Sequence, residues 1–317
     1  MRTAFFSEMG FVGKTPRTHK NMRTEFAWFV ALDADHVPIK AIPTENRIIY
    51  DLGVLIIPKN VKNFMNMDIV SNMKRICKKV AFMQEGPSWY YQSLPLHESI
   101  WFLKQMMSVD IVFAHNDIDK KYYEGLLEKP TYINPTLMIE DSLKDIVKVE
   151  RSGVIIGGNL VRWYGGMDSY MVALELGHKI SAPQMGRMDK AELNVEDINH
   201  LPYLEWYGWM KELNKFKYAV HLNPNTIGGT FSLNCAYLGI PCIGNVHANT
   251  QRLCFPDLSV EHNDLVTAKK LAVKLKNDND FYTMVSEKAK SLYTEHFSEK
   301  KYIMTMDTNF NEISKLK

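Results

Sequence analysis

The chain has 317 residues, of which 46% are hydrophobic, and its formal net charge is only +2. This length predicts two domains of roughly 150 residues, each large enough for a core of its own. The longest uncharged apolar runs, 26–32 and 52–58, fall far short of the ~20 residues that span a bilayer, and no secretory leader pattern follows Met1. The four cysteines form no CxxC pair, so we expect reduced thiols in a cytoplasmic protein rather than a disulfide frame or a zinc site.

Strand-like and helix-like runs alternate along the first half of the chain, which predicts parallel α/β packing. The expected strands are 3–6, 39–42, a run within 47–57, 79–83, 111–114 and 131–133. The expected helices are about 23–32, 68–77, 98–107 and 120–127. The charged run 140–152 contains no clear strand, so we place within it the boundary between an N-terminal domain, 1–148, and a C-terminal domain, 149–317.

The loop after the first expected strand is rich in cations and amides. Gly13-Lys14-Thr15 superficially resembles a P-loop, but the glycine required five residues before the lysine is absent, because position 9 is Met. Pro16 also interrupts the helix start, which excludes an NTPase. So many polar groups beside glycines favour ligand binding over a merely solvated loop. The candidates are Gly13, Lys14, Arg17, His19, Lys20 and Arg23.

Two strand ends of the first domain carry candidate acids and bases. Glu85 follows an apolar strand and precedes a Gly-Pro turn, while His115 and Asp117 follow the strand 111–114. A carboxylate in a cleft can be tuned toward a general base that deprotonates a hydroxyl. A helix cap or an ion-pair partner explains each residue as readily, and Asp117 suits a cap for the following helix. Among the catalytic candidates Glu85, His115 and Asp117, we favour Glu85.

The second domain is expected to open with the strand 153–156. Further expected strands lie near 179–182, 204–207, 218–222 and 241–243, and most of 265–317 has the pattern of amphipathic helix. Both halves of the chain therefore predict a Rossmann-like α/β domain.

A glycine pair follows the strand 218–222. Gly228-Gly229 opens a helix over 231–238, and this arrangement presents free backbone N–H groups at the positive end of the helix dipole, which is a site for phosphate. The hydroxyl groups of Thr230 and Ser232 lie where they can add to that contact. An ordinary βαβ turn, in which the glycines serve only the backbone, explains the same residues.

The tract 218–245 resembles the donor-binding segment of nucleotide-sugar glycosyltransferases with the GT-B fold, especially the large retaining family 4. In that family a strand is followed by Glu-x-Phe-Gly, four residues, Glu-Ala and then Gly-x-Pro. Gly229, Ala236, Gly239 and Pro241 stand in register, whereas the two acidic positions hold Thr226 and Asn234. The family's second carboxylate binds the donor ribose, and Asn234 offers an uncharged replacement. The resemblance implies donor contacts from Gly228, Gly229, Thr230, Phe231, Ser232 and Asn234.

The opening of the second domain extends the resemblance. Where family 4 has Gly-Arg-Leu, a few residues and Lys-Gly, this chain has Gly158-Asn159-Leu160 and then Tyr164-Gly165. The family's Arg and Lys hold the donor diphosphate. Arg162 is the one basic residue between 157 and 166, and it is our candidate for the missing charge. A surface arginine that covers Trp163 is the alternative reading.

The resemblance implies two Rossmann-like domains that face each other across a cleft, with a last helix, fitted by 302–313, that returns to the first domain. It places the cationic loop 10–28 on the acceptor side and implies a UDP-sugar donor without a required cofactor. Asp33-Ala34-Asp35 has the Asp-x-Asp form of the metal-dependent GT-A enzymes, but it ends a predicted helix, so no metal is expected.

The identity of the acceptor is left open. Residues 1–80 hold thirteen Lys and Arg against seven Asp and Glu, an excess that suits a polyanion such as double-stranded DNA but also a solvated helix face. The segments 19–28 and 157–169 are similar to small bacteriophage glycosyltransferases, some of which add glucose or arabinose to hydroxymethylcytosine in DNA. A polysaccharide or small-molecule acceptor, a sugar-nucleotide epimerase and an inactive binding protein are the alternatives.

Overall fold

The computed structural model describes residues 1–8, 12–19, 22, 25–57, 60–84, 86–147, 149–158, 160, 162–184 and 190–316, without the side chain of Arg162. The chain divides into two compact units, each built around one sheet. Unit 1 comprises Met1–His19, Thr24–Pro135 and Tyr302–Lys317, and unit 2 comprises Lys20–Arg23 and Thr136–Lys301. None of the described helices is both long and apolar enough to span a bilayer.

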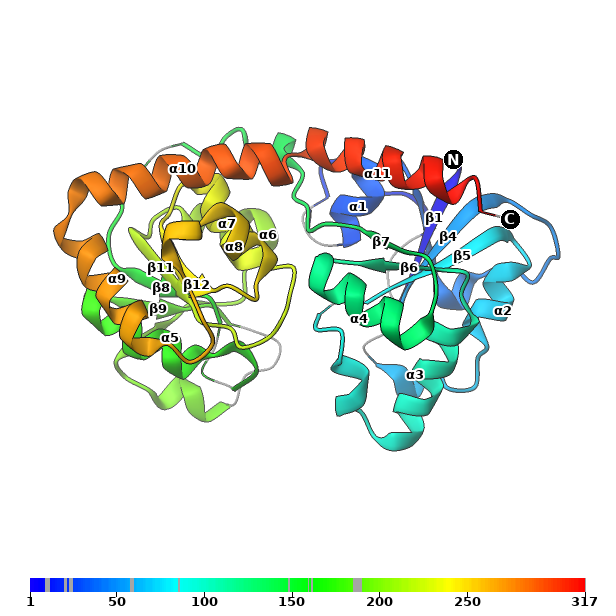
Figure 1. Ribbon diagram of the computed structural model, residues 1–317, viewed down its shortest axis with the longest axis horizontal. Helices are drawn as coiled ribbons and strands as arrows, with labels where there is room; N and C mark the ends of the chain where they lie inside the picture. Colours follow the sequence, from blue (N-terminus) through cyan, green and yellow to red (C-terminus); the bar gives the residue numbers. More distant parts are fainter. Residues whose placement is uncertain are drawn as a thin grey trace. The chain divides into compact units, whose positions relative to one another are not determined.

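Unit 1 contains a seven-stranded sheet in the order β2-β3-β1-β4-β5-β6-β7 (Figure 1). Its pairings are parallel, except that β2 runs antiparallel to β3. The strands are β1 Thr3–Ser7, β2 Gly13–Lys14, β3 Asp35–Pro38, β4 Tyr50–Ile56, β5 Cys77–Met83, β6 Ile111–Ala114 and β7 Thr131–Ile133. The helices are α1 Glu25–Ala31, α2 Ile69–Lys74, α3 Leu96–Ser108, α4 Asp117–Leu127 and α11 Glu299–Ile313, with 3-10 turns η1 Ile39–Ala41, η2 Val61–Asn63 and η3 Tyr90–Ser93.

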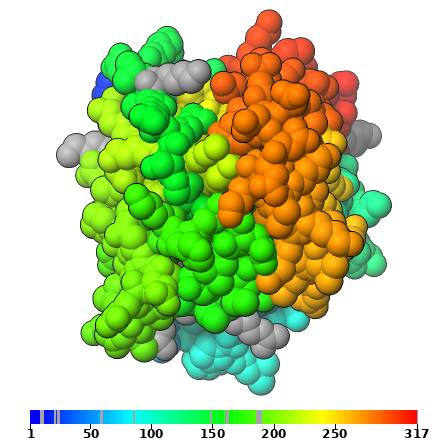
Figure 2. All heavy atoms as spheres, turned by 90° about the vertical axis from the view of Figure 1, so that its left-hand side faces the viewer, coloured from blue at the N-terminus to red at the C-terminus, as the bar shows by residue number. Residues whose placement is uncertain are grey.

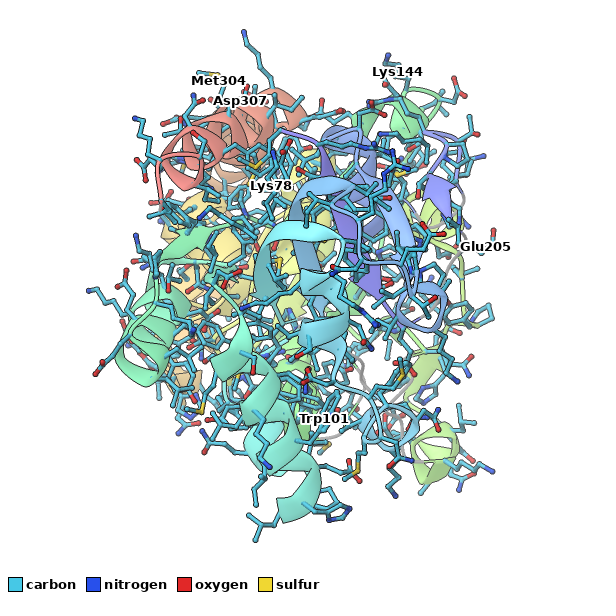
Figure 3. All side chains as sticks on the ribbon, turned by 90° about the vertical axis from the view of Figure 1, so that its right-hand side faces the viewer. Lys78, Trp101, Lys144, Glu205, Met304 and Asp307 are labelled. Carbon is cyan, nitrogen blue, oxygen red and sulfur yellow. The ribbon has the colours of Figure 1, made fainter. Side chains whose placement is uncertain are left out.

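The central strands of unit 1 are apolar along most of their length because helices cover both faces of a parallel sheet. The register places Leu55 of β4 beside Phe82 of β5, and Phe82 beside Val112 of β6, all buried. At the opposite end of β5 the strand meets solvent, and Lys78 forms an ion pair of 2.7 Å with Asp51 (Figure 3). The apolar middle and charged margin fix the register of the sheet.

Unit 2 contains a six-stranded parallel sheet in the order β10-β9-β8-β11-β12-β13. The strands are β8 Val154–Ile156, β9 Ile180–Ala182, β10 Ile198–His200, β11 Tyr218–His221, β12 Cys242–Asn245 and β13 Ser259–Val260. The helices are α5 Gly166–Leu176, α6 Trp206–Leu213, α7 Thr230–Leu238, α8 Asn249–Cys254, α9 Leu265–Asn277 and α10 Asn279–Phe297, with 3-10 turns η4 Glu140–Leu143, η5 Arg162–Tyr164, η6 Lys190–Asn194 and η7 Pro256–Leu258.

Helices cover both faces of the second sheet as well. α5 and α9 pack together on one face, and α7 and α8 pack together on the other (Figure 1). Figure 2 shows one face of unit 2, where the orange helices lie beside the green segment that contains α5. Lys269 of α9 pairs with Glu175 of α5 at 3.1 Å. The predicted pair of Rossmann-like α/β sheets is therefore confirmed.

Two predicted strands were wrong. In both cases an apolar run was taken for a strand without knowledge of the residues that it contacts in the fold. The strand expected at 39–42 is a 3-10 turn, and the strand lies earlier, at Asp35–Pro38. The polar His36 belongs to it because its ring is buried against Phe29, at 4.6 Å, and bonds to Ser7 at 2.8 Å. The segment expected as a strand at 204–207 instead enters α6, whose buried positions 206, 209, 210 and 213 have helical spacing.

α11 contributes to unit 1 from Tyr302 onward. Tyr302 is buried, and the side-chain amide of Asn309 donates to the carbonyl of Ile133 at the end of β7, at 2.8 Å. The assignment of acceptor and donor roles to residues 1–148 and 149–317 stays a prediction.

Candidate functional site

The sheet of unit 2 reverses its strand order between β8 and β11. The chain continues from β8 through β9 to β10 on one side, and from β11 through β12 to β13 on the other. Open α/β sheets bind ligands at such a switch point, outside the carboxyl ends of the strands. The turns that leave β8 and β11 therefore define the candidate site.

The turn after β11 ends in an uncapped helix. Gly229, the N-cap of α7, has φ +86°, and a Cβ there would overlap the hydroxyl oxygen of Thr250. No side chain caps α7, and the N–H groups of Thr230, Phe231 and Ser232 have no acceptor among the described residues. Unpaired N–H groups at the positive end of a helix dipole form an anion site.

The start of α8 holds this turn in one conformation. The N–H of Asn249 donates to the carbonyl of Ile227 at 3.0 Å, and the N–H of Thr250 donates to that of Gly228 at 3.2 Å. The hydroxyls of Ser232 and Thr250 lie 2.5 Å apart, and they reach the carbonyl of Gly229 at 3.1 and 2.5 Å. The hydroxyl of Ser232 is thus used inside the turn. Its N–H, by contrast, has no acceptor among the described residues and can bind a ligand.

The turns after β8 and β11 are also bonded to each other. Gly165, with φ +65°, approaches the carbonyl of Leu222 so closely that a Cβ would overlap it. The hydroxyl of Ser169 donates to the carbonyl of Gly165 at 2.8 Å and accepts from the N–H of Leu222 at 2.9 Å. The amide of Asn225 donates to the carbonyl of Trp163 at 2.8 Å. These bonds fix the spacing between the two turns.

Most of the predicted donor residues lie at this edge of the sheet. Gly158 is the second residue after β8, and Gly228 lies at the end of the turn after β11. Phe231 points into the interior, where its ring lies 6.2 Å from that of Trp209. Asn159 lies outside the described residues, as does the side chain of Arg162. Their predicted contacts with the donor stay predictions.

Asn234 is buried beneath the helix start and is 2% exposed. With its amide oriented to satisfy both ends, the ring N–H of Trp209 donates to its oxygen at 2.9 Å and its nitrogen donates to the carbonyl of Thr230 at 3.2 Å. A hydrogen bond to a ribose hydroxyl would have to replace one of these. The predicted ribose contact thus requires a rearrangement of Asn234.

His221 closes β11 at the same edge and was not among the predicted residues. Its side chain is buried, and its ring meets that of Phe231 at 5.2 Å. Burial lowers the pKa of the imidazole to about 4, so the ring is neutral at pH 7.

In unit 1 the candidate base His115 lies at the carboxyl end of β6. It is buried, and its Nε2 lies 2.8 Å from the carbonyl oxygen of Gln84, at the end of β5. Because a carbonyl only accepts, Nε2 carries the hydrogen of this contact. The hydroxyl of Tyr123 donates to the side chain of Gln84 at 3.2 Å. Glu85 lies outside the described residues.

Asn116, rather than Asp117, caps α4. Its side-chain oxygen accepts from the N–H groups of residues 118 and 119 at 3.0 and 2.9 Å, while Asp117 is exposed in the first turn. The nitrogen of Asn116 donates to the carboxylate of Asp119 at 2.9 Å. Burial raises the pKa of Asp119 to about 6, against the hydrogen bonds from Ser88 and Asn116 that lower it. A buried acid beside the His115 strand end was missed from the sequence.

Lys14 and the Asp-x-Asp motif form one ion-pair cluster. Lys14 lies in β2, with its ammonium 3.2 Å from Asp33 and 3.4 Å from Asp35. Within the described part of the chain, no group of three or more His, Cys, Asp or Glu residues is arranged to hold a metal ion. The charge of Lys14 is thus largely balanced inside unit 1.

The rest of the predicted acceptor loop is only partly described. Gly13 precedes Lys14 in β2 with φ +111°, Arg17 is exposed, and the ring of His19 stacks on Phe26 at 4.3 Å. The remaining members, Lys20 and Arg23, lie outside the described residues. The acceptor role of this loop stays a prediction.

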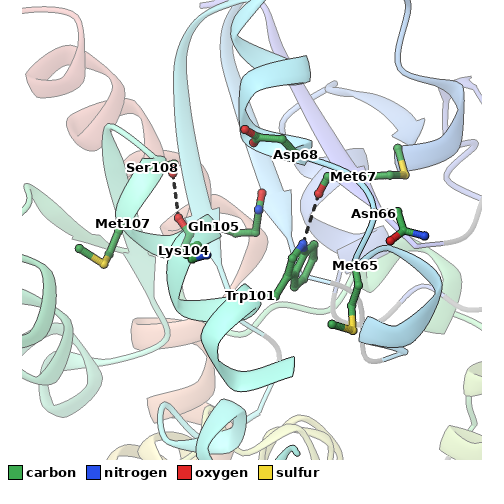
Figure 4. Close-up of a pocket in the computed structure, with 9 residues that line it drawn as sticks. All are labelled: Met65, Asn66, Met67, Asp68, Trp101, Lys104, Gln105, Met107 and Ser108. Carbon is green, nitrogen blue, oxygen red and sulfur yellow. Dashed lines mark hydrogen bonds between the residues drawn. The ribbon is translucent and has the colours of Figure 1, made fainter. Parts of the chain in front are cut away.

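A cavity of about 510 Å³ lies elsewhere in unit 1, between α3 and the segment before α2 (Figure 4). The ring N–H of Trp101 donates to the carbonyl of Met67 at 3.2 Å, and Gln105 accepts from the N–H of Val70 at 3.2 Å. These buried polar groups are used by the fold, and none of the predicted site residues lines the cavity. It therefore has less to offer a polar ligand than the switch point of unit 2.

The residues that sequence reasoning missed act through distant partners. Thr250 and Ser169 belong to no local motif, since their hydroxyls meet Gly229 and Gly165 only after folding. Asn116 did leave a signal, because an N-cap residue followed three positions later by an acid resembles a capping box.

Neither a protein-family model nor a curated protein sequence matches this chain. Solved structures match it over almost its whole length. Sucrose-phosphate synthase from Thermosynechococcus elongatus has a TM-score of 0.65 at 8% identity, with 99% of each chain covered. HepE from Anabaena, in complex with UDP and glucose, has a TM-score of 0.64 at 8% identity, covering 98% of this chain and 100% of that one.

A third similar structure is an alpha-glucosyltransferase in complex with UDP and a 13-mer DNA that contains an HMU base. Its TM-score is 0.61 at 13% identity, with 99% of each chain covered. These neighbours are GT-B glycosyltransferases, and the chain has their fold, as the sequence resemblance implied.

Proposed function

We propose that this protein is a glycosyltransferase that moves a sugar from a UDP-sugar to an acceptor hydroxyl. The observation that carries the proposal is the uncapped start of α7 at the switch point of unit 2, held open by Gly229 and Thr250. A nucleotide-sugar donor carries a diphosphate, which is the kind of anion that such a helix start binds.

The wider site suits a diphosphate. The turn after β8 brings Gly158 to the same edge, and the bonds through Ser169 and Asn225 keep the two turns at a fixed spacing. Arg162 lies in the first of these turns and is the proposed source of positive charge. A preorganised set of hydrogen-bond donors stabilises the charge that develops on the leaving UDP.

The structural neighbours support the same donor. HepE was solved with UDP and glucose, and the alpha-glucosyltransferase with UDP and DNA. Each spans nearly the same length as this chain, so the similarity involves both α/β units.

For the acceptor we propose 5-hydroxymethylcytosine in double-stranded DNA, with glucose or arabinose as the sugar. The DNA complex of one neighbour and the surplus of thirteen basic over seven acidic residues in 1–80 support this choice. Several of those cations are balanced within unit 1, among them Lys14, Lys74 and Lys78. DNA contacts would therefore fall to the cations that remain. A polysaccharide or small-molecule hydroxyl is the rival acceptor.

The proposed general base is one of the three acids and bases at the strand ends of unit 1, and Glu85 is the favoured one. His115 lies at the carboxyl end of β6, where its Nε2 is held by the carbonyl of Gln84. His115 and Asp117 remain the other predicted candidates for this role.

The test is a transfer assay. The protein is incubated with a panel of UDP-sugars and with hydroxymethylcytosine DNA, unmodified DNA or no acceptor, after which released UDP is measured and the digested nucleosides are weighed. We expect UDP release and a nucleoside heavier by one sugar only with hydroxymethylated DNA. UDP release without a DNA product would favour a polysaccharide or small-molecule acceptor. If UDP is neither released nor bound under any condition, the proposal of a UDP-sugar donor is refuted.

A further inference from the structure

His221 carries a ring nitrogen that the fold leaves unused. The residue is 6% exposed, and its Nε2 is buried without a hydrogen-bond partner among the described residues. Buried polar atoms are nearly always paired, and leaving one unpaired costs free energy. A phenylalanine or leucine would fill the same space without that cost, so the imidazole calls for an explanation beyond packing.

The position of the ring connects it to the proposed donor site. The N–H of Gly157 donates to the carbonyl of Val220 at 2.8 Å, so the turn after β8 begins alongside the end of β11. A Cβ on Gly157 would overlap the ring of His221, and Phe231 in the first turn of α7 meets the ring from its own side. The imidazole therefore lies between the two turns that the proposed function assigns to the diphosphate.

We propose that Nε2 of His221 donates a hydrogen bond to a phosphate oxygen of the nucleoside diphosphate donor. The inference rests on the proposed function, because it specifies one contact within that donor site. A phosphate offers only acceptors, and a neutral imidazole protonated on Nε2 supplies the matching donor. The glycine at 157 leaves room for the ring. Because Nε2 is buried in the free protein, the contact requires the ring to turn toward the ligand, and Nε2 gains its partner only when the ligand is present.

The contact makes a spectroscopic prediction. Burial alone lowers the pKa of His221, and no ionisable side chain among the described residues contributes to the shift; its ring neighbours are the main chain at Gly157 and the apolar ring of Phe231. A phosphate oxygen beside the ring favours the charged form, so bound UDP should raise the pKa of His221 above its value in the free protein. A histidine that only fills space would titrate identically with and without UDP.

The experiment compares UDP and uridine binding to the full chain and to two variants by calorimetry. His221→Phe keeps the ring that packs between Gly157 and Phe231 and removes the nitrogen. His200→Phe is the matched control, because the Nε2 of His200 is also buried without a partner but lies at the end of the edge strand β10. We expect His221→Phe to weaken UDP binding at least 10-fold, as loss of a hydrogen bond to a charged group does. Uridine affinity should stay near that of the unmodified protein, the melting temperature should not fall, and His200→Phe should bind both ligands normally.

The outcomes separate the two proposals. Absence of UDP binding by the unmodified protein would refute the donor and this contact together. Tight UDP binding that His221→Phe leaves unchanged would refute the contact alone. If His221→Phe does not fold, the histidine titration of the unmodified protein, followed by NMR with and without UDP, decides: an unchanged pKa of His221 overturns the inference.

Discussion

Gly229→Ala is the substitution that most sharply probes the candidate donor site. Gly229 has φ +86°, and a Cβ at this position would overlap the hydroxyl oxygen of Thr250. Left-handed backbone costs a residue with a Cβ about 1–2 kcal/mol, and forcing a methyl group into a filled site costs about 1–3 kcal/mol. We therefore expect the free energy of unfolding to fall by about 2–5 kcal/mol, and UDP binding to weaken because the start of α7 is displaced.

A second substitution separates the two terms. Thr250→Ala removes the overlapping hydroxyl, and the next atoms that the new Cβ would meet, in Ser232 and Ala248, are 3.1 and 3.4 Å away. In that background Gly229→Ala should cost only the backbone strain, about 1–2 kcal/mol. The double-mutant cycle should therefore show a coupling of about 1–3 kcal/mol between positions 229 and 250.

The assay is urea unfolding followed by circular dichroism, with UDP affinity measured by calorimetry on each folded variant. Gly177→Ala is the control, because Gly177 has extended backbone at φ 163° and no atom lies within 4 Å of a Cβ built there. The described geometry of this turn is wrong if alanine at 229 lowers the free energy of unfolding no more than alanine at 177 does. It is also wrong if alanine at 229 has the same effect in the Thr250→Ala background as in the unmodified protein.

Three further predictions concern charge. The pKa of Asp119 is raised to about 6 from 3.8, so between these pH values the folded state holds a proton that the unfolded state has lost. The free energy of unfolding should therefore fall by up to about 3 kcal/mol as the pH rises through this window. Urea titrations from pH 4 to 7 measure this fall. Asp119→Asn should abolish that fall and exposed Asp117→Asn should keep it, and a fall that survives Asp119→Asn would contradict the assignment. Arg162→Ala should weaken UDP binding by about 1.5–3 kcal/mol in calorimetry, and unchanged affinity would remove Arg162 from the donor site. Neutralising Lys20 and Arg23 should weaken DNA binding at all sequences, and the slope of log K against log salt should flatten by about 0.9 per lost phosphate contact. A double variant with normal salt dependence would take this loop out of the acceptor site.

The local pattern predicted elements wherever burial alone determines them. The strands Ile111–Ala114 and Thr131–Ile133 were predicted with their observed ends, because each is a short apolar run bounded by turn residues. β3 was misplaced because Asp35 and His36 become strand residues only through pairing with β1 and β2. α6 was misread because Trp206 and Trp209 suit a strand by residue type and a helix by spacing.

The candidate site was predictable in its backbone but not in its side chains. Gly228-Gly229 after an apolar strand pointed to an anion-binding helix start, and the structure has that start. Nothing local to Thr250 or His221 marks them, since the one meets Gly229 across 21 residues and the other lies beside Gly157 only through the pairing of β8 with β11. Roles that arise from strand order become visible only when the sheet is known.

The most direct test of the donor site is an NMR titration of the ¹⁵N-labelled protein with UDP and, separately, with uridine. If the start of α7 binds the diphosphate, the backbone N–H signals of Thr230, Phe231 and Ser232, which have no acceptor among the described residues, should shift downfield with UDP and stay in place with uridine. Saturating UDP binding that leaves these three signals unmoved would contradict the assignment of the donor site to this turn.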